Sequence, residues 1–239
     1  SSADQRASGG VDFRSEAANP GSILILPGSE FFPAGYYSIP TERRSEFLDM
    51  EIIGNPGINL FDQNPWMSLI PKIERSGATG RINYILNDYA TAFVHTTYRK
   101  LKTHYEMAPT PAFGDRNIDT WGILPSSNPF NPFGDSTDWA KLSKTQKGEA
   151  VSFKHRFVEV GPRISDIQSD VLRILPGVKF DIGDSWQAET AFLYNRVEST
   201  DIGRNFVSTD ALKEALASSD PATAYNIFGA GSGINSSSV

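Results

Sequence analysis

Apolar and polar side chains begin to alternate regularly at Ala78, and the alternation predicts a first β-hairpin over residues 78–101. A period of two puts one set of side chains on each face of a strand. Asn87-Asp88 predicts a tight turn, after which the alternation resumes from Tyr89 to Leu101. Phe93 falls on the polar side, so the alternation is imperfect. The set on one parity before the turn is Ile82, Tyr84 and Leu86, against Arg81 and Asn83 on the other.

The same pattern recurs in residues 171–197 and predicts a second hairpin. Gly183-Asp184-Ser185 supplies its turn. The apolar parity carries Leu172, Ile174, Val178, Phe180, Ile182, Trp186, Ala188, Phe192 and Tyr194, against Arg173, Lys179, Asp181, Gln187, Glu189 and Asn195.

The rest of the chain is rich in Pro, Gly and Asn and is predicted to be mainly loop. Residues 1–77 contain two brief apolar runs, Ile23–Leu26 and Glu51–Ile53, which are candidate short strands. Residues 102–170 contain a further candidate strand at Val151–Val160. Residues 198–239 contain one predicted helix, Asp210–Ser218, capped by Ser208 or Thr209 and stopped by Pro221, and then a Gly/Ser-rich tail from Gly229.

Alternation by itself fits both a soluble β-sandwich and a membrane barrel, because each has one apolar and one polar face. Three features favour the membrane. The predicted strands reach the roughly 9–11 residues that cross a bilayer at a tilt. Aromatic residues stand near the strand ends, as in interfacial girdles. The connections are minimal at one end of the hairpins and very long at the other, as in outer-membrane barrels.

Composition and motifs argue against several functional classes. A net charge of −6 with scattered Lys and Arg disfavours nucleic acid as a partner. The chain has no cysteine and only three histidines, His95, His104 and His155, so neither a metal site nor a thiol nucleophile is expected. No nucleophile-elbow, P-loop or dinucleotide-binding motif is present. We therefore expect no catalytic residues, no cofactor and no enzymatic activity.

Several segments resemble the TonB-dependent outer-membrane receptors. Asn128-Pro129-Phe130-Asn131-Pro132-Phe133-Gly134 is similar to an Asn-Pro-Phe-Gly element in external loops of that family, and 224–229 is a looser copy that follows a similar loop segment at 215–223. Residues 74–80 and 177–186 are similar to the family's early barrel hairpins. The resemblance covers about residues 60–230, and the order and spacing of its elements carry it.

The resemblance implies an all-β fold of antiparallel up-and-down strands, part of a transmembrane β-barrel with long external loops. It further implies a Gram-negative outer-membrane location, contact with outer-membrane lipid, a small-molecule or oligosaccharide ligand, and energy from TonB. The chain departs from the family in lacking a TonB box and a plug domain, and it has far fewer than about 22 strands. It also lacks a terminal aromatic strand. We therefore expect an internal fragment of the barrel, which in isolation aggregates in water.

Two groups of residues are candidate substrate contacts. Aromatic and amide side chains in the long loop suit stacking on a sugar or an organic chelate, although loops of this size also pack against themselves; these are Trp121, Phe130, Asn131, Phe133 and Trp139. Polar residues of the strands would line the lumen, with Arg99, Arg173 and Glu189 as candidate contacts. His95 is expected in the lumen and His104 in a loop, and Glu159 and Asp166 are expected to solubilise a turn.

Two functions from different classes remain open on the sequence, and a third, a β-rich hydrolase, is distant because no catalytic constellation is visible. The first is active import of a siderophore, vitamin or oligosaccharide. The second is glycan binding by a soluble secreted β-domain.

Overall fold

The computed structural model describes residues 4–25, 33–39, 56–114, 122–131, 133–134, 150–183 and 185–228. Antiparallel β-sheet dominates these residues. The chain divides into two compact units, which are described separately here. Unit 1 comprises Ser1–Met67, Met107–Arg163 and Asn205–Val239, and unit 2 comprises Ser68–Glu106 and Ile164–Arg204.

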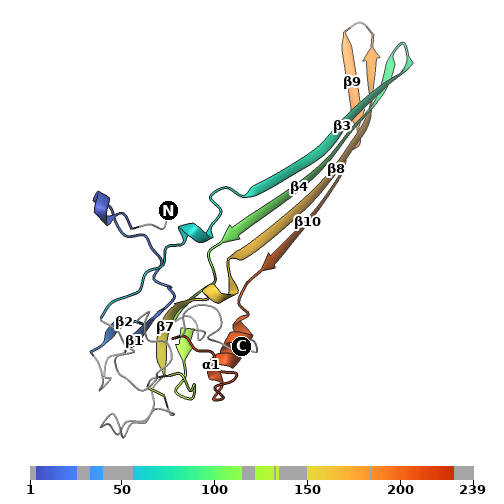
Figure 1. The fold of residues 1–239 in the computed structure, drawn as a ribbon. Helices are drawn as coiled ribbons and strands as arrows, with labels where there is room; N and C mark the ends of the chain where they lie inside the picture. Colours follow the sequence, from blue (N-terminus) through green and yellow to red (C-terminus); the bar gives the residue numbers. More distant parts are fainter. Residues whose placement is uncertain are drawn as a thin grey trace, which may run out of the picture. The chain divides into compact units, whose positions relative to one another are not determined.

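Unit 2 is one long antiparallel sheet whose strands run side by side (Figure 1). Their order is β10-β8-β4-β3, and β9 also pairs with β8. The strands are β3 (Lys72–Asn87), β4 (Ala90–Met107), β8 (Arg163–Ile182), β9 (Trp186–Ala191) and β10 (Tyr194–Arg204).

Both predicted hairpins are confirmed. β3 pairs with β4 in a register that places Ile82 opposite Val94, and β8 pairs with β9 with Phe180 opposite Ala188. The first turn closes as an Asx turn, in which the Tyr89 N–H donates to Asn87 Oδ1 at 2.9 Å. Sheet pairing extends beyond the predicted hairpins, so residues 102–107, 163–170 and 198–204, which were predicted to be loop, are strand. Residues 72–77 also belong to β3; apart from Ile73 they are polar or Gly and show no alternation, although their backbone pairs with β4.

β9 and β10 continue one another along the edge of β8. The register is unchanged across the gap, with Gly177 opposite Ala191 and Ile174 opposite Tyr194. Pro176 lies opposite the gap; its carbonyl accepts from the Phe192 N–H at 2.9 Å. Proline has no N–H to return the second ladder bond, which explains the local interruption.

Among the described strands of unit 2, the sheet is open. Its edges are β3 on one side and β9 with β10 on the other. The all-β antiparallel class that the sequence predicted is therefore confirmed, and the described strands are not closed into a barrel.

Unit 1 contains a smaller antiparallel sheet built around β7 (Val151–Arg156). β7 pairs with three other strands, and β2 pairs with β1. The predicted strand at Ile23–Leu26 is observed as β1, the one at Val151–Val160 ends at Arg156 and continues as a 3-10 turn, and Glu51–Ile53 lies outside the described residues. The partners of β7 are β1 (Ser22–Ile25), β5 (Pro111–Phe113) and β6 (Ile123–Leu124), with β2 at Gly35–Ser38.

The predicted helix is present as α1 (Thr209–Ala217). Ser208 caps it, its Oγ accepting from the Ala211 N–H. Leu212 and Leu216 are buried in the core of unit 1 beside Phe153 and Ile227, so the apolar stripe serves packing. No helix among the described residues is long and apolar enough to span a membrane.

Candidate ligand-binding surface

The long sheet of unit 2 has two faces of different chemistry. We call the face that carries the even-numbered side chains of β4, β8, β9 and β10 face A, and the opposite one face B. Even residues of β3 up to Tyr84 join face A, since β3 pairs with β4 in an even-to-even register. The hydrogen bond from Tyr98 Oη to Asp170 Oδ1 at 2.7 Å ties even residues of β4 and β8 together on this face.

Face A is apolar towards the two hairpin turns. Many of its side chains there stand exposed: Ile82 is 70%, Phe180 39% and Trp186 76% exposed. An exposed apolar surface of this continuity marks contact with something apolar. The apolar members at this end of face A are Ile82, Tyr84, Ala92, Val94, Leu172, Ile174, Val178, Phe180, Ile182, Trp186, Ala188 and Tyr194.

Towards the opposite end of the sheet, face A becomes charged. Tyr98 stands at the change, with its hydroxyl bonded to Asp170. A hollow of about 630 Å³ opens over this charged end. The charged side chains are Lys72, Glu74, Lys100, Lys102, His104, Asp166, Asp170, Arg196, Glu198 and Arg204.

An ion network centred on Asp166 organises the charged end. His104 Nδ1 lies 2.7 Å from Asp166 Oδ1, and Arg204 Nη1 donates to Asp166 Oδ2 at 2.6 Å. The hydrogen bond with Asp166, helped by Glu106 at 3.4 Å, raises the pKa of His104. The same bond lowers the pKa of Asp166. Two expectations are corrected: His104 lies on β4 and not in a loop, and Asp166 is an ion-paired strand residue and not a turn solubiliser.

Face B is mainly polar, and the predicted lumen residues lie on it. Glu189 on β9 forms an ion pair with Lys179 on β8, with 3.1 Å between Glu189 Oε2 and Lys179 Nζ. Arg99 and Arg173 are exposed on β4 and β8. His95 lies on this face beside Phe93, with ring centroids 5.1 Å apart. The sequence grouped these residues correctly by face because parity decides it.

Arg75 was not a candidate on the sequence, yet it lies beside Arg99. Both line a hollow of about 560 Å³ on face B, with Gly77 between them. Arg75 precedes the segment in which alternation begins, so its pattern gave no signal. The length of the strand, continued by backbone pairing alone, places it there.

The aromatic loop candidates divide differently. Trp121 and Trp139 lie outside the described residues. Phe133 is 2% exposed and belongs to the core of unit 1, and Asn131 is equally buried. Phe130 remains partly accessible. Packing of the loop on itself therefore accounts for Phe133 and Asn131, and ligand contact stays a prediction for this group.

Three Asn-x-Phe segments form identical turns in unit 1. In each, the Asn Oδ1 accepts from the backbone N–H of the Phe two residues on: Asn128 to Phe130 at 2.8 Å, Asn131 to Phe133 at 2.9 Å, and Asn226 to Phe228 at 2.9 Å. Asn128 Nδ2 also donates to the Leu216 and Tyr225 carbonyls, joining the first Asn-Pro-Phe segment to its looser copy. The motif that carries the family resemblance thus has a structural role here.

A buried polar cluster also lies in unit 1. Tyr225 Oη donates to Glu159 Oε1 and lies 3.3 Å from His155 Nε2. Burial lowers the pKa of His155 to about 3, with Arg156 contributing, so the ring is neutral. Burial raises the pKa of Glu159, although its bond to Tyr225 opposes the shift. Glu159 was expected to solubilise a turn; it does lie in a 3-10 turn, but it is partly buried and bonded to Tyr225.

Two arginine arrangements hold the first segment of the chain in place. The buried Arg156 donates to the carbonyls of Ala17 and Pro109 at 2.9 and 2.7 Å, and to Ser15 Oγ at 2.8 Å. These bonds satisfy its guanidinium, which a buried cation requires.

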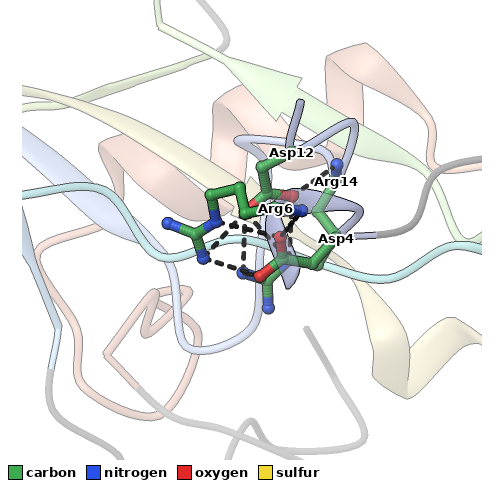
Figure 2. Close-up of polar contacts among 4 residues, drawn as sticks. All are labelled: Asp4, Arg6, Asp12 and Arg14. Carbon is green, nitrogen blue, oxygen red and sulfur yellow. Dashed lines mark hydrogen bonds and ion pairs between the residues drawn. The ribbon is translucent and has the colours of Figure 1, made fainter. Parts of the chain in front are cut away.

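The second arrangement is a ring of four charges (Figure 2). Asp4 and Asp12 each accept from the backbone N–H of the arginine two residues on, Arg6 and Arg14, at 3.1 Å. Crossed ion pairs of 3.3 Å join Arg6 to Asp12 and Arg14 to Asp4. Because the four charges neutralise one another, the ring fixes a turn and offers no net charge to a ligand.

No group of three or more potential ligands that could hold a metal ion occurs in the part of the chain that the structure describes. No model of a known protein family matches the chain, and no curated protein matches it.

Proposed function

We propose that this chain forms part of the barrel wall of a Gram-negative outer-membrane active transporter, of the TonB-dependent receptor kind. Such a transporter binds a scarce nutrient outside the cell and imports it with energy from TonB. The observation that carries the proposal is the division of face A into an exposed apolar band and a charged end. A soluble sheet would have to cover the apolar band, whereas lipid covers it in a membrane.

The height of the apolar band supports a bilayer as its solvent. On β8 the band runs from Leu172 to Ile182. At about 3.3 Å per residue this is roughly 33 Å along the strand, or about 23 Å of height at a tilt near 45°. Outer-membrane barrels have an apolar band about 25 Å tall. His104 and Asp166 lie beyond the band and hence outside the bilayer in this proposal.

The connections support a direction across the membrane. Both short turns lie at the apolar end of the sheet, where the Asp181 N–H donates to the Tyr89 carbonyl at 2.9 Å. The chain leaves the sheet for its long segments only at the charged end, where Lys72 lies opposite His104. Since outer-membrane barrels have short periplasmic turns and long external loops, the turns are periplasmic and residues 108–162 and 205–239 are external in this proposal.

The remaining parts of the proposal follow from the same orientation. Face B lines the lumen, and polar side chains such as Arg99, Arg173 and Glu189 form its wall. The open edges at β3 and at β9 with β10 pair with further strands, since unpaired edges do not occur in lipid. In this proposal TonB acts through a plug domain. The ligand is a siderophore, vitamin or oligosaccharide.

The experiment uses the absence of cysteine from the chain. Single cysteines replace Phe180 on face A and Lys179 on face B of the full-length protein in vesicles of outer-membrane lipid, and each carries an environment-sensitive fluorophore. Nitroxide-labelled lipid is expected to quench the label at position 180, and aqueous iodide the label at position 179. Equal quenching of both positions by iodide would contradict the proposal and favour a soluble glycan-binding domain.

A further inference from the structure

The hollow on face B lies over three neighbouring strands of the sheet, and two arginines line it. It opens above β3, β4 and β8, and its volume is about 560 Å³. Two cations, Arg75 and Arg99, are the charged side chains that face B contributes to its lining. The other face B residues there are Gly77, Thr79, Leu101, Ser169 and Val171.

The register puts the two guanidinium groups within reach of one ligand. Arg75 lies opposite Leu101 and Gly77 opposite Arg99, so the two arginines are diagonal neighbours on adjacent strands. Diagonal positions are about 7–8 Å apart, a distance that two long side chains span easily. Like charges at such positions repel one another, and an anion between them removes the repulsion.

No side chain in the described part of the chain neutralises either arginine. Among the residues that the structure describes, the guanidinium groups of Arg75 and Arg99 have no hydrogen bond or ion pair to the protein, although the backbone of both pairs in the β3–β4 ladder. Other cations of the same sheet do have partners, with Lys179 bonded to Glu189 and Arg204 to Asp166. Each guanidinium can donate two parallel N–H hydrogen bonds, a geometry that matches a carboxylate or phosphate group.

Gly77 gives the hollow its floor. A Cβ at this position would lie 3.3 Å from Arg99 Cγ and 2.6 Å from the Tyr98 carbonyl oxygen. The missing side chain thus lets the stem of Arg99 lie close over β3. Leu101 and Val171 add apolar surface, and Thr79 and Ser169 add hydroxyl groups. The hollow therefore combines two cations with an apolar base.

We propose that this hollow binds a small organic anion through Arg75 and Arg99, with carboxylate or phosphate groups held by the two guanidiniums and the carbon skeleton on Leu101 and Val171. The anion site stands on these residues alone. Its assignment as a substrate site of transport rests on the proposed function, because only there is face B the wall of the lumen. In that setting the imported nutrient is anionic.

Calorimetric titration of the full-length protein in detergent tests the site, with citrate and pyrophosphate as anionic probes and maltotriose as a neutral probe. Both anions are expected to bind and maltotriose not to bind at this site. Arg75→Gln and Arg99→Gln should each weaken citrate binding by about tenfold, the effect of one charge-assisted hydrogen bond. The citrate affinity of Arg75→Lys should lie between those of the wild type and Arg75→Gln, since lysine keeps the charge but cannot donate two parallel hydrogen bonds.

Arg196→Gln is the matched control, because it removes the same charge from face A, where Arg196 is paired with Glu198. Its citrate affinity should stay at the wild-type value. The inference is wrong if the folded protein binds neither anion, or if Arg196→Gln weakens binding as much as Arg99→Gln does. If the label at position 180 is exposed to lipid but no anion binds, the anion site is rejected and the transporter proposal stands. If the anions bind but the label at position 180 is not exposed to lipid, the anion site stands and the transporter proposal is rejected.

Discussion

The ring of Phe93 lies over Gly177 of the neighbouring strand. A Cβ at position 177 would be 2.4 Å from Phe93 Cζ, and the ring is only 3% exposed although most of its sheet is open to solvent. Lys179 Nζ stands 5.9 Å from the ring centroid on the same face. A residue that breaks the alternation of β4 is thus accommodated by a glycine that has no side chain on β8.

Gly177→Ala should destabilise the protein by about 1–3 kcal/mol, because the new methyl group overpacks Phe93 and approaches the Thr190 carbonyl at 2.7 Å. Urea unfolding measures the change. Gly80→Ala is the control, since its Cβ would meet only Thr96 Cγ2, at 3.3 Å. Combining Gly177→Ala with Phe93→Ala should cost less than the sum of the two; additive costs would mean that the two residues do not interact.

Asn128→Ala should destabilise unit 1 by about 2–4 kcal/mol, because it removes the turn bond to the Phe130 N–H and both donations to the Leu216 and Tyr225 carbonyls. Asn128→Asp keeps the turn acceptor but places a carboxylate against two carbonyls, so it should be at least as harmful. Thermal unfolding compares both with Asn195→Ala, an exposed control expected to change stability by less than about 0.5 kcal/mol. A mild effect of Asn128→Asp would show that the turn bond alone matters.

The pH dependence of the charged end of face A follows from two opposite shifts. Because the pKa of His104 is raised, protonated His104 contributes fully to the free energy of unfolding below the ordinary histidine pKa of about 6.5. This contribution is lost as pH rises through the raised pKa. Because the pKa of Asp166 is lowered, ionised Asp166 contributes fully to the free energy of unfolding above about pH 3.9. This contribution is lost as pH falls through the lowered pKa. This network is therefore strongest between roughly pH 4 and 6.5.

Nuclear magnetic resonance titration of the His104 ring measures the shift directly. Asp166→Asn should lower the His104 pKa towards its ordinary value, and Glu106→Gln should lower it less. Asp201→Asn, on face B, where Asp201 accepts from Ser165 Oγ, should leave it unchanged. An unaltered His104 titration in Asp166→Asn would contradict the network.

Phe180→Arg should destabilise the membrane-inserted protein by about 2–4 kcal/mol if Phe180 faces lipid near the midplane. Lys179→Gln on face B should be mild, because an exposed ion pair such as Lys179–Glu189 contributes about 1 kcal/mol or less. Unfolding in lipid vesicles measures both. Similar costs for the two variants would mean that the faces do not divide lipid from lumen.

Epitope insertion tests the proposed direction across the membrane. A tag near Ser136, which lies outside the described residues, should be labelled on intact cells. A tag in the turn after Asn87 should be labelled only once the outer membrane is opened. The reverse pattern would invert the topology.

The sequence alone determined the hairpins, their turns and the division of side chains between two faces. Strands have a side-chain period of two and Asn-Asp or Gly-rich turns have local chemistry, so both can be recognised within about twenty residues. The helix at Thr209–Ala217 was likewise predicted, because Ser208 caps it and its Leu stripe has helical spacing.

Only the tertiary structure decided the length of the strands and the surroundings of particular side chains. Residues 72–77 join β3 through backbone pairing with β4, which no side-chain pattern reports, and this brings Arg75 beside Arg99. His104 meets Asp166 across 62 positions of sequence, and Asn128 meets Tyr225 across 97. Such contacts depend on which strands and turns become neighbours, a property of the folded chain that local periodicity does not contain.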